Sequence, residues 1–252
     1  MSTELQAKQR LSWDACYNVR DVGGYATADG GTTRWQALVR ADNLYRLTRA
    51  GQDALRAYGI KTIIDLRHAQ ELALDPSPFR GHVTETHGLN YVHAPLPAGA
   101  DRAMITAVDA ARSLEVMNLR MLDGFRPGIA AIMATLANAP AGGVLIHCHI
   151  GKDRTGLITA LSLAVAGVPH ELIVADYALS QEYLRPLFDQ ELNAEPDVER
   201  RAESAIWLSS APETMQAILK HLDHEYGGAE QYLLRAGVTP ADIERIRQRL
   251  RT

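Results

Sequence analysis

The sequence predicts an α/β fold, with a mainly parallel central sheet flanked by helices, on the basis of two observations. Short runs of apolar and β-branched residues alternate with helical patterns, and these runs lie at residues 37–40, 62–66, 91–93 and 144–146. Parallel strands need crossover helices between them, so this alternation is typical of such a sheet. Glycine and proline are scattered as turns, without a linker, repeat or low-complexity tract, so we expect one domain over residues 1–252.

Helical patterns connect and follow the strands. Between the first two runs, Thr48 can cap a helix that reaches Tyr58 and ends at Gly59. After Gly156 the remaining pattern is helical, including residues 212–226 with one apolar stripe. We therefore expect a helical C-terminal layer whose apolar positions belong to the core.

Residues 101–138 are helical in pattern but interrupted near Gly124 and Pro127. Proline removes a backbone donor and disfavours helix in the residue before it. The segment therefore predicts two helices rather than one.

Charge and composition exclude several classes of protein. The chain has 26 Lys and Arg against 30 Asp and Glu, a formal net charge of -4, which gives no global field for nucleic acid or anionic lipid. Its most apolar stretch, residues 156–168, is shorter than the roughly 20 residues that cross a bilayer. Two cysteines make no disulfide framework, and the first ten residues lack the apolar core of a signal peptide. We expect a cytoplasmic protein. Secretion by a route that needs no signal peptide is left open.

The informative stretch is HCHIGKDRTG, residues 147–156, which we call the signature loop. It follows an apolar strand and precedes an apolar helix. A glycine-containing loop that enters a helix N-terminus leaves several backbone N–H groups unpaired, where the helix dipole also favours negative charge. Such a loop predicts an anion-binding cradle.

Cys148 and Arg154 are spaced so that both can face one bound phosphate. Unpaired N–H groups and positive potential favour thiolate over thiol, which makes Cys148 a candidate nucleophile. Arg154 can grip two phosphoryl oxygens with its planar fork, and Thr155 can donate its hydroxyl to the sulfur. The expected phosphate-binding residues are His149, Ile150, Gly151, Lys152, Thr155 and Gly156.

The signature loop resembles that of the cysteine-dependent protein tyrosine phosphatase superfamily. It most closely resembles the bacterial tyrosine and lipid phosphatase-like family, whose loop has the form HCxxGKDRTG. Other blocks that resemble the family lie at residues 18–24, 39–41, 65–67, 167–169, 175–177, 226–228 and 232–233. The resemblance implies a phosphatase that forms a cysteinyl-phosphate without a metal or other cofactor, acting on phosphotyrosine and also on phosphoserine, phosphothreonine or phosphoinositides. Its partners would be phosphorylated proteins, peptides or phosphoinositides.

The general acid is open. By resemblance, Asp153 within the signature loop is the first candidate, followed by Asp123 and Asp65. Asp153 lies next to Arg154, which favours the carboxylate rather than the acid form. The alternative is that Asp153 orders the loop through an ion pair with Arg20 or Arg67.

The resemblance also assigns roles around the loop. Lys152 would add a second positive charge, which in the family accompanies acceptance of phosphoinositides. Residues 101–124 resemble the variable lid region, and we expect the first half of the helical lid segment, 101–138, to cover the active site. His147 would be a buried supporting residue.

Other supporting residues have two interpretations with equal weight. Arg20, Asp21, Arg40 and Arg67 either contact substrate or form ion pairs that hold the N-terminal segment on the sheet. Cys16 is interpreted as inert.

Three rival functions are weaker. A Walker-type loop needs four residues between its glycines and Ser or Thr after the lysine, whereas Gly143 and Gly151 are separated by seven residues and Asp153 follows Lys152. A metal site fails because adjacent strand residues point to opposite faces and no second cysteine pair is present. A binding module that holds phosphate without turnover remains the alternative, and the intact Cys, Arg and Thr set favours an enzyme.

Overall fold

A five-stranded sheet forms the centre of the fold, in the order β1-β2-β5-β3-β4. The structure is a computed structural model that describes residues 2–80 and 88–252. β1 is antiparallel to β2 and the other pairs are parallel, which confirms the expected α/β class. The strands are β1 (Arg20–Asp21), β2 (Leu38–Ala41), β3 (Ile60–Asp65), β4 (Asn90–His93) and β5 (Gly143–His147).

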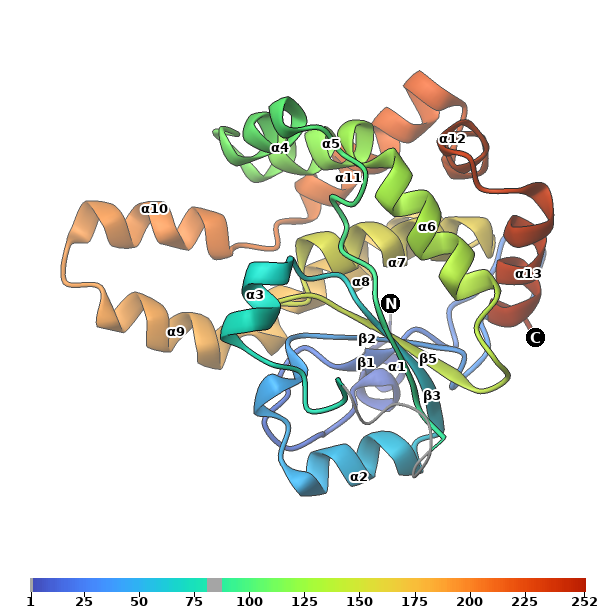
Figure 1. Cartoon of the computed structure of the whole chain (residues 1–252), viewed down its shortest axis with the longest axis horizontal. Coiled ribbons are helices and arrows are strands. Elements are labelled where there is room, and N and C mark those ends of the chain that lie inside the picture. The colour runs from blue at the N-terminus through green and yellow to red at the C-terminus, as the bar shows by residue number, and fades with distance from the viewer. Residues whose placement is uncertain (1, 81–87) are drawn as a thin grey trace.

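Helices cover both faces of this sheet (Figure 1). In chain order they are α1 (Thr3–Gln9), α2 (Arg49–Ala57), α3 (Ala69–Leu74), α4 (Arg102–Asp109), α5 (Leu114–Gly124), α6 (Arg126–Ala137), α7 (Asp153–Val165), α8 (His170–Tyr183), α9 (Arg185–Ala194), α10 (Val198–Leu208), α11 (Pro212–His221), α12 (Ala229–Ala236) and α13 (Pro240–Leu250). Two short turns, η1 (Leu44–Arg46) and the π-helical η2 (Leu222–Tyr226), complete the set.

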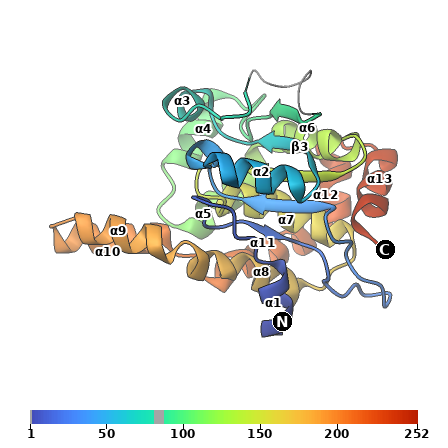
Figure 2. The same ribbon diagram turned by 90° about the horizontal axis from the view of Figure 1, so that it is seen from below.

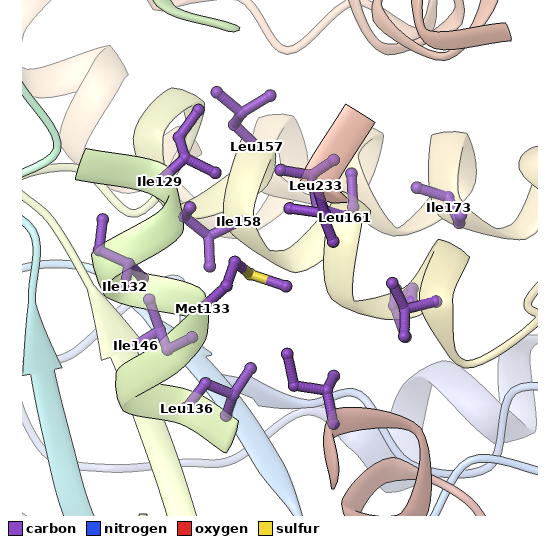
Figure 3. Packing of buried hydrophobic residues seen from close by; sticks show 14 of the residues in the cluster. Ile129, Ile132, Met133, Leu136, Ile146, Leu157, Ile158, Leu161, Ile173 and Leu233 are labelled. Carbon is purple, nitrogen blue, oxygen red and sulfur yellow. The ribbon is translucent and has the colours of Figure 1, made fainter. Parts of the chain in front are cut away.

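The larger core lies between the sheet and the helices of the second half of the chain. Figure 3 shows Ile132 and Met133 of α6 facing Ile158 of α7, with Ile146 of β5 beside them. These side chains are fully buried. Because α7 is apolar around most of its circumference, it lies inside the molecule, as the sequence predicts for the segment after the signature loop.

The opposite face of the sheet carries a smaller core. Alternate strand residues such as Val39, Ile63 and Leu145 point to this side, where they pack on Leu55 of α2 and on Trp13. α2 begins after Thr48, whose hydroxyl accepts a hydrogen bond from the Gly51 N–H. The predicted crossover helix is therefore confirmed, including its end at Gly59, which has a left-handed φ of 98°.

Residues 101–138 form three helices, α4, α5 and α6, so the expectation of two was wrong. The break at Gly124 and Pro127 is present, but a second break precedes α5. There Ser113 caps a new helix by accepting the N–H of Val116. The predicted first helix is therefore divided in two, because Ser113 caps the start of a separate helix.

α9 and α10 form a helical hairpin that projects from the body, as Figures 1 and 2 both show. Leu184, Phe188 and Leu208 form a small separate core at its base, against Ile150 of the signature loop and Leu187 and Leu192 of α9. Val198, near the tip, is largely exposed. The hairpin is thus attached to the fold next to the loop. Among the described residues, no helix has the length and apolar character needed to span a membrane.

Candidate active site

β5 delivers the signature loop to one end of the sheet, between its neighbours β2 and β3. The turn after His147 leads directly into α7, whose first residue is Asp153. Gly151 has a left-handed φ of 72°, and a Cβ there would collide with the carbonyl of Ala41. Only glycine can therefore bring the loop this close to β2.

The Cys148 sulfur lies under this turn. Its side chain is only 2% exposed, and its Sγ accepts the N–H of Gly151 at 3.3 Å. This N–H belongs to the loop that enters α7, where the positive end of the helix dipole attracts negative charge. Thr155 is buried, and its hydroxyl makes no hydrogen bond within the described residues, so the expected bond to sulfur is not formed.

Arg154 occupies the mouth of the loop with a carboxylate partner that the sequence analysis missed. Its Nη1 and Nη2 donate to the two carboxylate oxygens of Glu71 at 2.6 and 2.7 Å. One of these oxygens also accepts the N–H of His68. Burial would raise the pKa of Glu71, but the hydrogen bonds and charge of Arg154 lower it to about 2. Glu71 is therefore a carboxylate at any working pH, held in the fork that a phosphoryl group would use.

A network of buried polar side chains supports the loop from below. The Asn18 amide donates to the Ile150 and Gly151 carbonyls, at 3.3 and 3.1 Å. The Arg40 guanidinium also donates to the Gly151 carbonyl, at 2.8 Å. Because these donors occupy carbonyl oxygens on one side of the turn, its N–H groups remain on the other.

Asp176 of α8 joins this network to the N-terminal segment. Its carboxylate forms ion pairs with Arg20 at 2.9 Å and with Arg40 at 2.5 Å, and all three side chains are at most 1% exposed. Burial would raise the pKa of Asp176, but the two guanidinium groups lower it to about 2. We call Asn18, Arg20, Arg40 and Asp176 the underside network.

A second buried cluster surrounds His147. Asp65, which ends the neighbouring strand β3, accepts hydrogen bonds from Arg67 and from the Tyr91 hydroxyl, and lies 3.5 Å from the His147 Nε2. Burial would raise the pKa of Asp65, but His147 and the hydrogen bonds from Arg67 hold it below its usual range. Burial lowers the pKa of His147, and the nearby Asp65 carboxylate opposes this shift. Asp65 is therefore an ionised, fully hydrogen-bonded carboxylate.

Comparison with known proteins decides the family. The family model for the tyrosine phosphatase family matches residues 11–252. The chain belongs to this family. A tyrosine-protein phosphatase of Nostoc commune is 33% identical over 231 residues, which cover 85% of this chain and 74% of that relative. A triple specificity protein phosphatase of Mycobacterium tuberculosis is 30% identical over 271 residues, covering 92% and 95%. The chain is therefore a phosphoric monoester hydrolase of the tyrosine phosphatase type.

The phosphatase holds Asp153, the first acid candidate, on the first turn of α7. Its Oδ1 accepts hydrogen bonds from Tyr177 at 3.1 Å and Asn118 at 3.3 Å. The expected pairing of Asp153 with Arg20 or Arg67 is wrong, because those arginines bind Asp176 and Asp65 instead.

Two expected site residues have partners elsewhere in the phosphatase. Asp123 lies against His221 and Tyr226 of the C-terminal layer. Asp21 accepts the Gly23 N–H and the Tyr58 hydroxyl, and burial raises its pKa. No hydrogen bond joins either carboxylate to the signature loop within the described residues.

Lys152 of the phosphatase turns away from the mouth. Its Nζ donates to the carbonyls of Trp207 and Ser209 at the end of α10, both at 2.7 Å. It also lies 3.5 Å from the Asp153 carboxylate, and its side chain is 1% exposed. Burial lowers the pKa of Lys152.

A pocket of about 350 Å³ opens beside the loop. Its walls come from the loop itself, from the segment before β1, from the segment after β2 and from α9. They include His149, Ile150, Tyr17, Tyr45, Arg46, Leu187, Phe188 and Glu191. The expected lid segment, 101–138, supplies none of the described residues that line it. α5 does reach the loop region, where the Asn118 amide donates to Asp153, and the lid stays a prediction.

The missed residues share one signal. Glu71 lies on α3, the first helix after β3. Asn43, which lines the pocket and whose N–H donates to the His149 carbonyl at 2.9 Å, lies two residues after β2. Both strands run parallel to β5 and flank it, so their carboxyl ends open at the signature loop. In the sequence, the available signal was that polar residues follow the two strands that flank β5. Such residues could have been predicted to lie near the signature loop. No cluster of three or more metal-ligating side chains occurs in residues 2–80 and 88–252.

Proposed function

We propose that this phosphatase acts through a cysteinyl-phosphate intermediate on Cys148. The observation that carries the proposal is the position of the buried Cys148 sulfur, which accepts the Gly151 N–H beside the start of α7, with Arg154 on the first turn of that helix. Thiol, backbone donors and guanidinium thus surround one site for an anion.

The reaction has two displacements. In the first, the Cys148 thiolate attacks phosphorus, a sulfur–phosphorus bond forms, and the bond to the leaving oxygen breaks as Asp153 gives that oxygen a proton. In the second, water attacks phosphorus, its proton passes to Asp153, and the sulfur–phosphorus bond breaks to release inorganic phosphate. Arg154 and the N–H groups around Gly151 stabilise the charge on the phosphoryl oxygens in both steps.

Phosphotyrosine on proteins or peptides is the proposed main substrate. The pocket beside the loop has aromatic and aliphatic side chains from Tyr17, Tyr45 and Phe188, which suit an aryl ring. Phosphoserine, phosphothreonine and phosphoinositides are the further candidates. The relative that is named a triple specificity protein phosphatase supports a range of substrates wider than phosphotyrosine.

Supporting roles follow from burial. We assign His147, Arg20, Arg40 and Arg67 to holding the loop rather than to substrate contact, because each is at most 1% exposed and hydrogen-bonded to protein groups. The binding module without turnover is less well supported than an enzyme, since the curated relatives are phosphatases over nearly the same length.

The experiment that tests this function uses Cys148→Ser with Cys16→Ser as a matched control. Cys16 is also buried, and its thiol donates to Asp42, a bond that serine can keep. We expect Cys148→Ser to lose about 10⁴-fold or more in hydrolysis of p-nitrophenyl phosphate while still binding tungstate. Acid-quenched wild-type enzyme should carry a phosphate on the peptide that contains residue 148.

The control should keep activity within a fewfold of wild type. Turnover that survives in Cys148→Ser, or wild-type activity that requires an added metal ion, contradicts the covalent mechanism. Comparing turnover of phosphotyrosyl peptides, phosphoseryl peptides and phosphoinositides then ranks the substrates.

A further inference from the structure

We propose that Lys152 is a positioning residue that fastens the end of α10 to the signature loop, so that the α9–α10 hairpin forms one wall of the substrate pocket. The inference rests on the proposed function, because that function identifies the pocket as the substrate site. The contact itself is observed independently of any activity.

The hydrogen bonds of the Lys152 ammonium are directed at protein. An ammonium group has three donors. Two are used by the carbonyls of Trp207 and Ser209, and the Asp153 carboxylate lies 3.5 Å away. Because the side chain is 1% exposed and these partners surround its nitrogen, it is not presented to a substrate phosphate as an open cation.

The carbonyls it binds belong to a helix C-terminus. Trp207 lies in the last turn of α10, and Ser209 is its C-cap. The last carbonyls of a helix lack intrahelical partners and carry the negative end of the helix dipole, which a lysine ammonium satisfies and stabilises. Lys152 therefore caps α10 from the signature loop, 55 residues away in the chain.

Few other contacts fix this end of the hairpin. Leu208 packs with Leu184 and Phe188 against Ile150, and the Ser210 N–H donates to the Gln181 side chain at 2.7 Å. The rest of the hairpin projects from the body in both ribbon views (Figures 1 and 2). Removing the Lys152 bonds should therefore loosen the hairpin locally without unfolding the protein.

The position of the hairpin matters because α9 lines the pocket. Leu187, Phe188 and Glu191 face the same cavity as His149 and Ile150 of the loop. A large substrate such as a phosphopeptide uses this wall, whereas p-nitrophenyl phosphate occupies little beyond the loop. Loss of the Lys152 contact should therefore affect large substrates more than small ones.

The test compares Lys152→Met with Gln181→Ala and Lys220→Met. Gln181→Ala loosens the same end of α10 without touching the loop or the net charge. Lys220→Met removes one positive charge from an exposed position on α11. Hydrogen exchange measured by mass spectrometry should be about tenfold faster, or more, at residues 205–211 in the first two variants and unchanged in the third.

Kinetics supply the second readout. Lys152→Met and Gln181→Ala should both raise KM for a phosphotyrosyl peptide severalfold more than KM for p-nitrophenyl phosphate, and the double variant should add little to either alone. If Lys152→Met folds poorly, Lys152→Gln, which keeps an N–H donor, should show the same changes to a smaller extent.

Unchanged exchange at residues 205–211 in Lys152→Met overturns the proposal. A selective loss of turnover on a polyphosphorylated inositol lipid would then assign Lys152 to substrate binding. If the wild-type protein hydrolyses no phosphomonoester, the proposed function is wrong. Faster hydrogen exchange in Lys152→Met would still support the Lys152 contact in that case.

Discussion

Two sets of ion pairs hold the signature loop, and they differ in burial. In the underside network, Arg20 and Arg40 share Asp176, and none of these side chains is more than 1% exposed. At the mouth, Arg154 and Glu71 form a two-pronged pair, and their side chains are 17% and 23% exposed. We call Arg154 and Glu71 the mouth pair.

This difference in burial separates arginines that hold the structure from the arginine that can bind phosphate. A buried ion pair that loses one member leaves an uncompensated charge in the interior, which costs about 3 to 5 kcal/mol. An ion pair on the open surface contributes about 0 to 1 kcal/mol, and the mouth pair lies between these two cases because solvent reaches part of both side chains. The underside network therefore fixes the shape of the loop, while the mouth pair can open for a phosphate.

Replacing an arginine in each set should give the largest and most contrasting effects. Arg154→Lys should lower kcat/KM by about 10³-fold, because lysine cannot make two parallel bonds to the transferring phosphoryl group. Its free energy of unfolding should change by less than about 1 kcal/mol. Arg40→Lys should instead lower stability by several kcal/mol, since a buried guanidinium with several partners is lost. Urea unfolding and initial rates measure both, and a destabilised Arg154→Lys would contradict the comparison.

Asp153 lies between the two sets and tests whether the loop also supplies the acid. If it does, Asp153→Asn should slow phosphotyrosine or alkyl phosphates about 10²-fold or more, but p-nitrophenyl phosphate much less, because its leaving group needs no proton. The counterargument is that Asp153 already accepts hydrogen bonds from Tyr177 and Asn118, which suits a side chain that orders the loop.

Tyr177→Phe and Asn118→Ala are the matched controls for Asp153. They remove hydrogen bonds to the carboxylate and keep the carboxylate itself. If both reproduce the effect of Asp153→Asn on all substrates alike, Asp153 supports the loop and is not the acid.

The sequence predicted the geometry of the loop better than that of its surroundings. Cys148, Gly151 and Arg154 are close in the chain, so their types and spacing carry the geometry of a turn entering a helix. The strands at 62–66 and 144–146 were visible because buried parallel strands are continuous apolar runs. β1 was missed because two residues, Arg20 and Asp21, show no periodicity.

Long-range partners were beyond the sequence. Glu71 meets Arg154 across 83 residues, and Lys152 meets Trp207 across 55, and nothing local in either segment marks the other. Each contact depends on where a neighbouring helix ends after the sheet is assembled. For the same reason Asp153 was expected beside Arg20 or Arg67, whereas the fold gives those arginines to other carboxylates.

Asp176→Asn probes the underside network through pH. The pKa of Asp176 is lowered to about 2 in the fold, against an ordinary value near 3.8. A carboxylate with a depressed pKa stabilises the fold above its unfolded pKa, and the contribution is lost as the pH falls from about 4 toward 2. Wild type should therefore lose of the order of 2 kcal/mol more than Asp176→Asn over this range.

The measurement is urea unfolding of both proteins between pH 6 and about pH 2. At pH 6 the variant should already be less stable by about 3 to 5 kcal/mol, because two buried guanidinium groups lose their shared charge. The gap should narrow as the pH falls. A gap that stays constant with pH would mean that the charge of Asp176 contributes nothing to the fold.

Glu71→Gln should have the smallest effect and the most informative sign. The amide keeps an oxygen for the His68 N–H, so α3 should remain capped, while the charge that competes with phosphate for Arg154 is removed. If the mouth pair opens for phosphate, the inhibition constant for tungstate should fall about two- to fivefold, the equivalent of a partly exposed ion pair.

Glu213→Gln, an exposed site on α11, is the control for net charge. Because the pKa of Glu71 is about 2, the ratio of the tungstate inhibition constants of Glu71→Gln and wild type should be constant from pH 5 to pH 8. Weaker tungstate binding in Glu71→Gln would reverse the assignment: the carboxylate would then hold Arg154 in place for phosphate rather than compete with it, and the mouth pair would be as structural as the underside network.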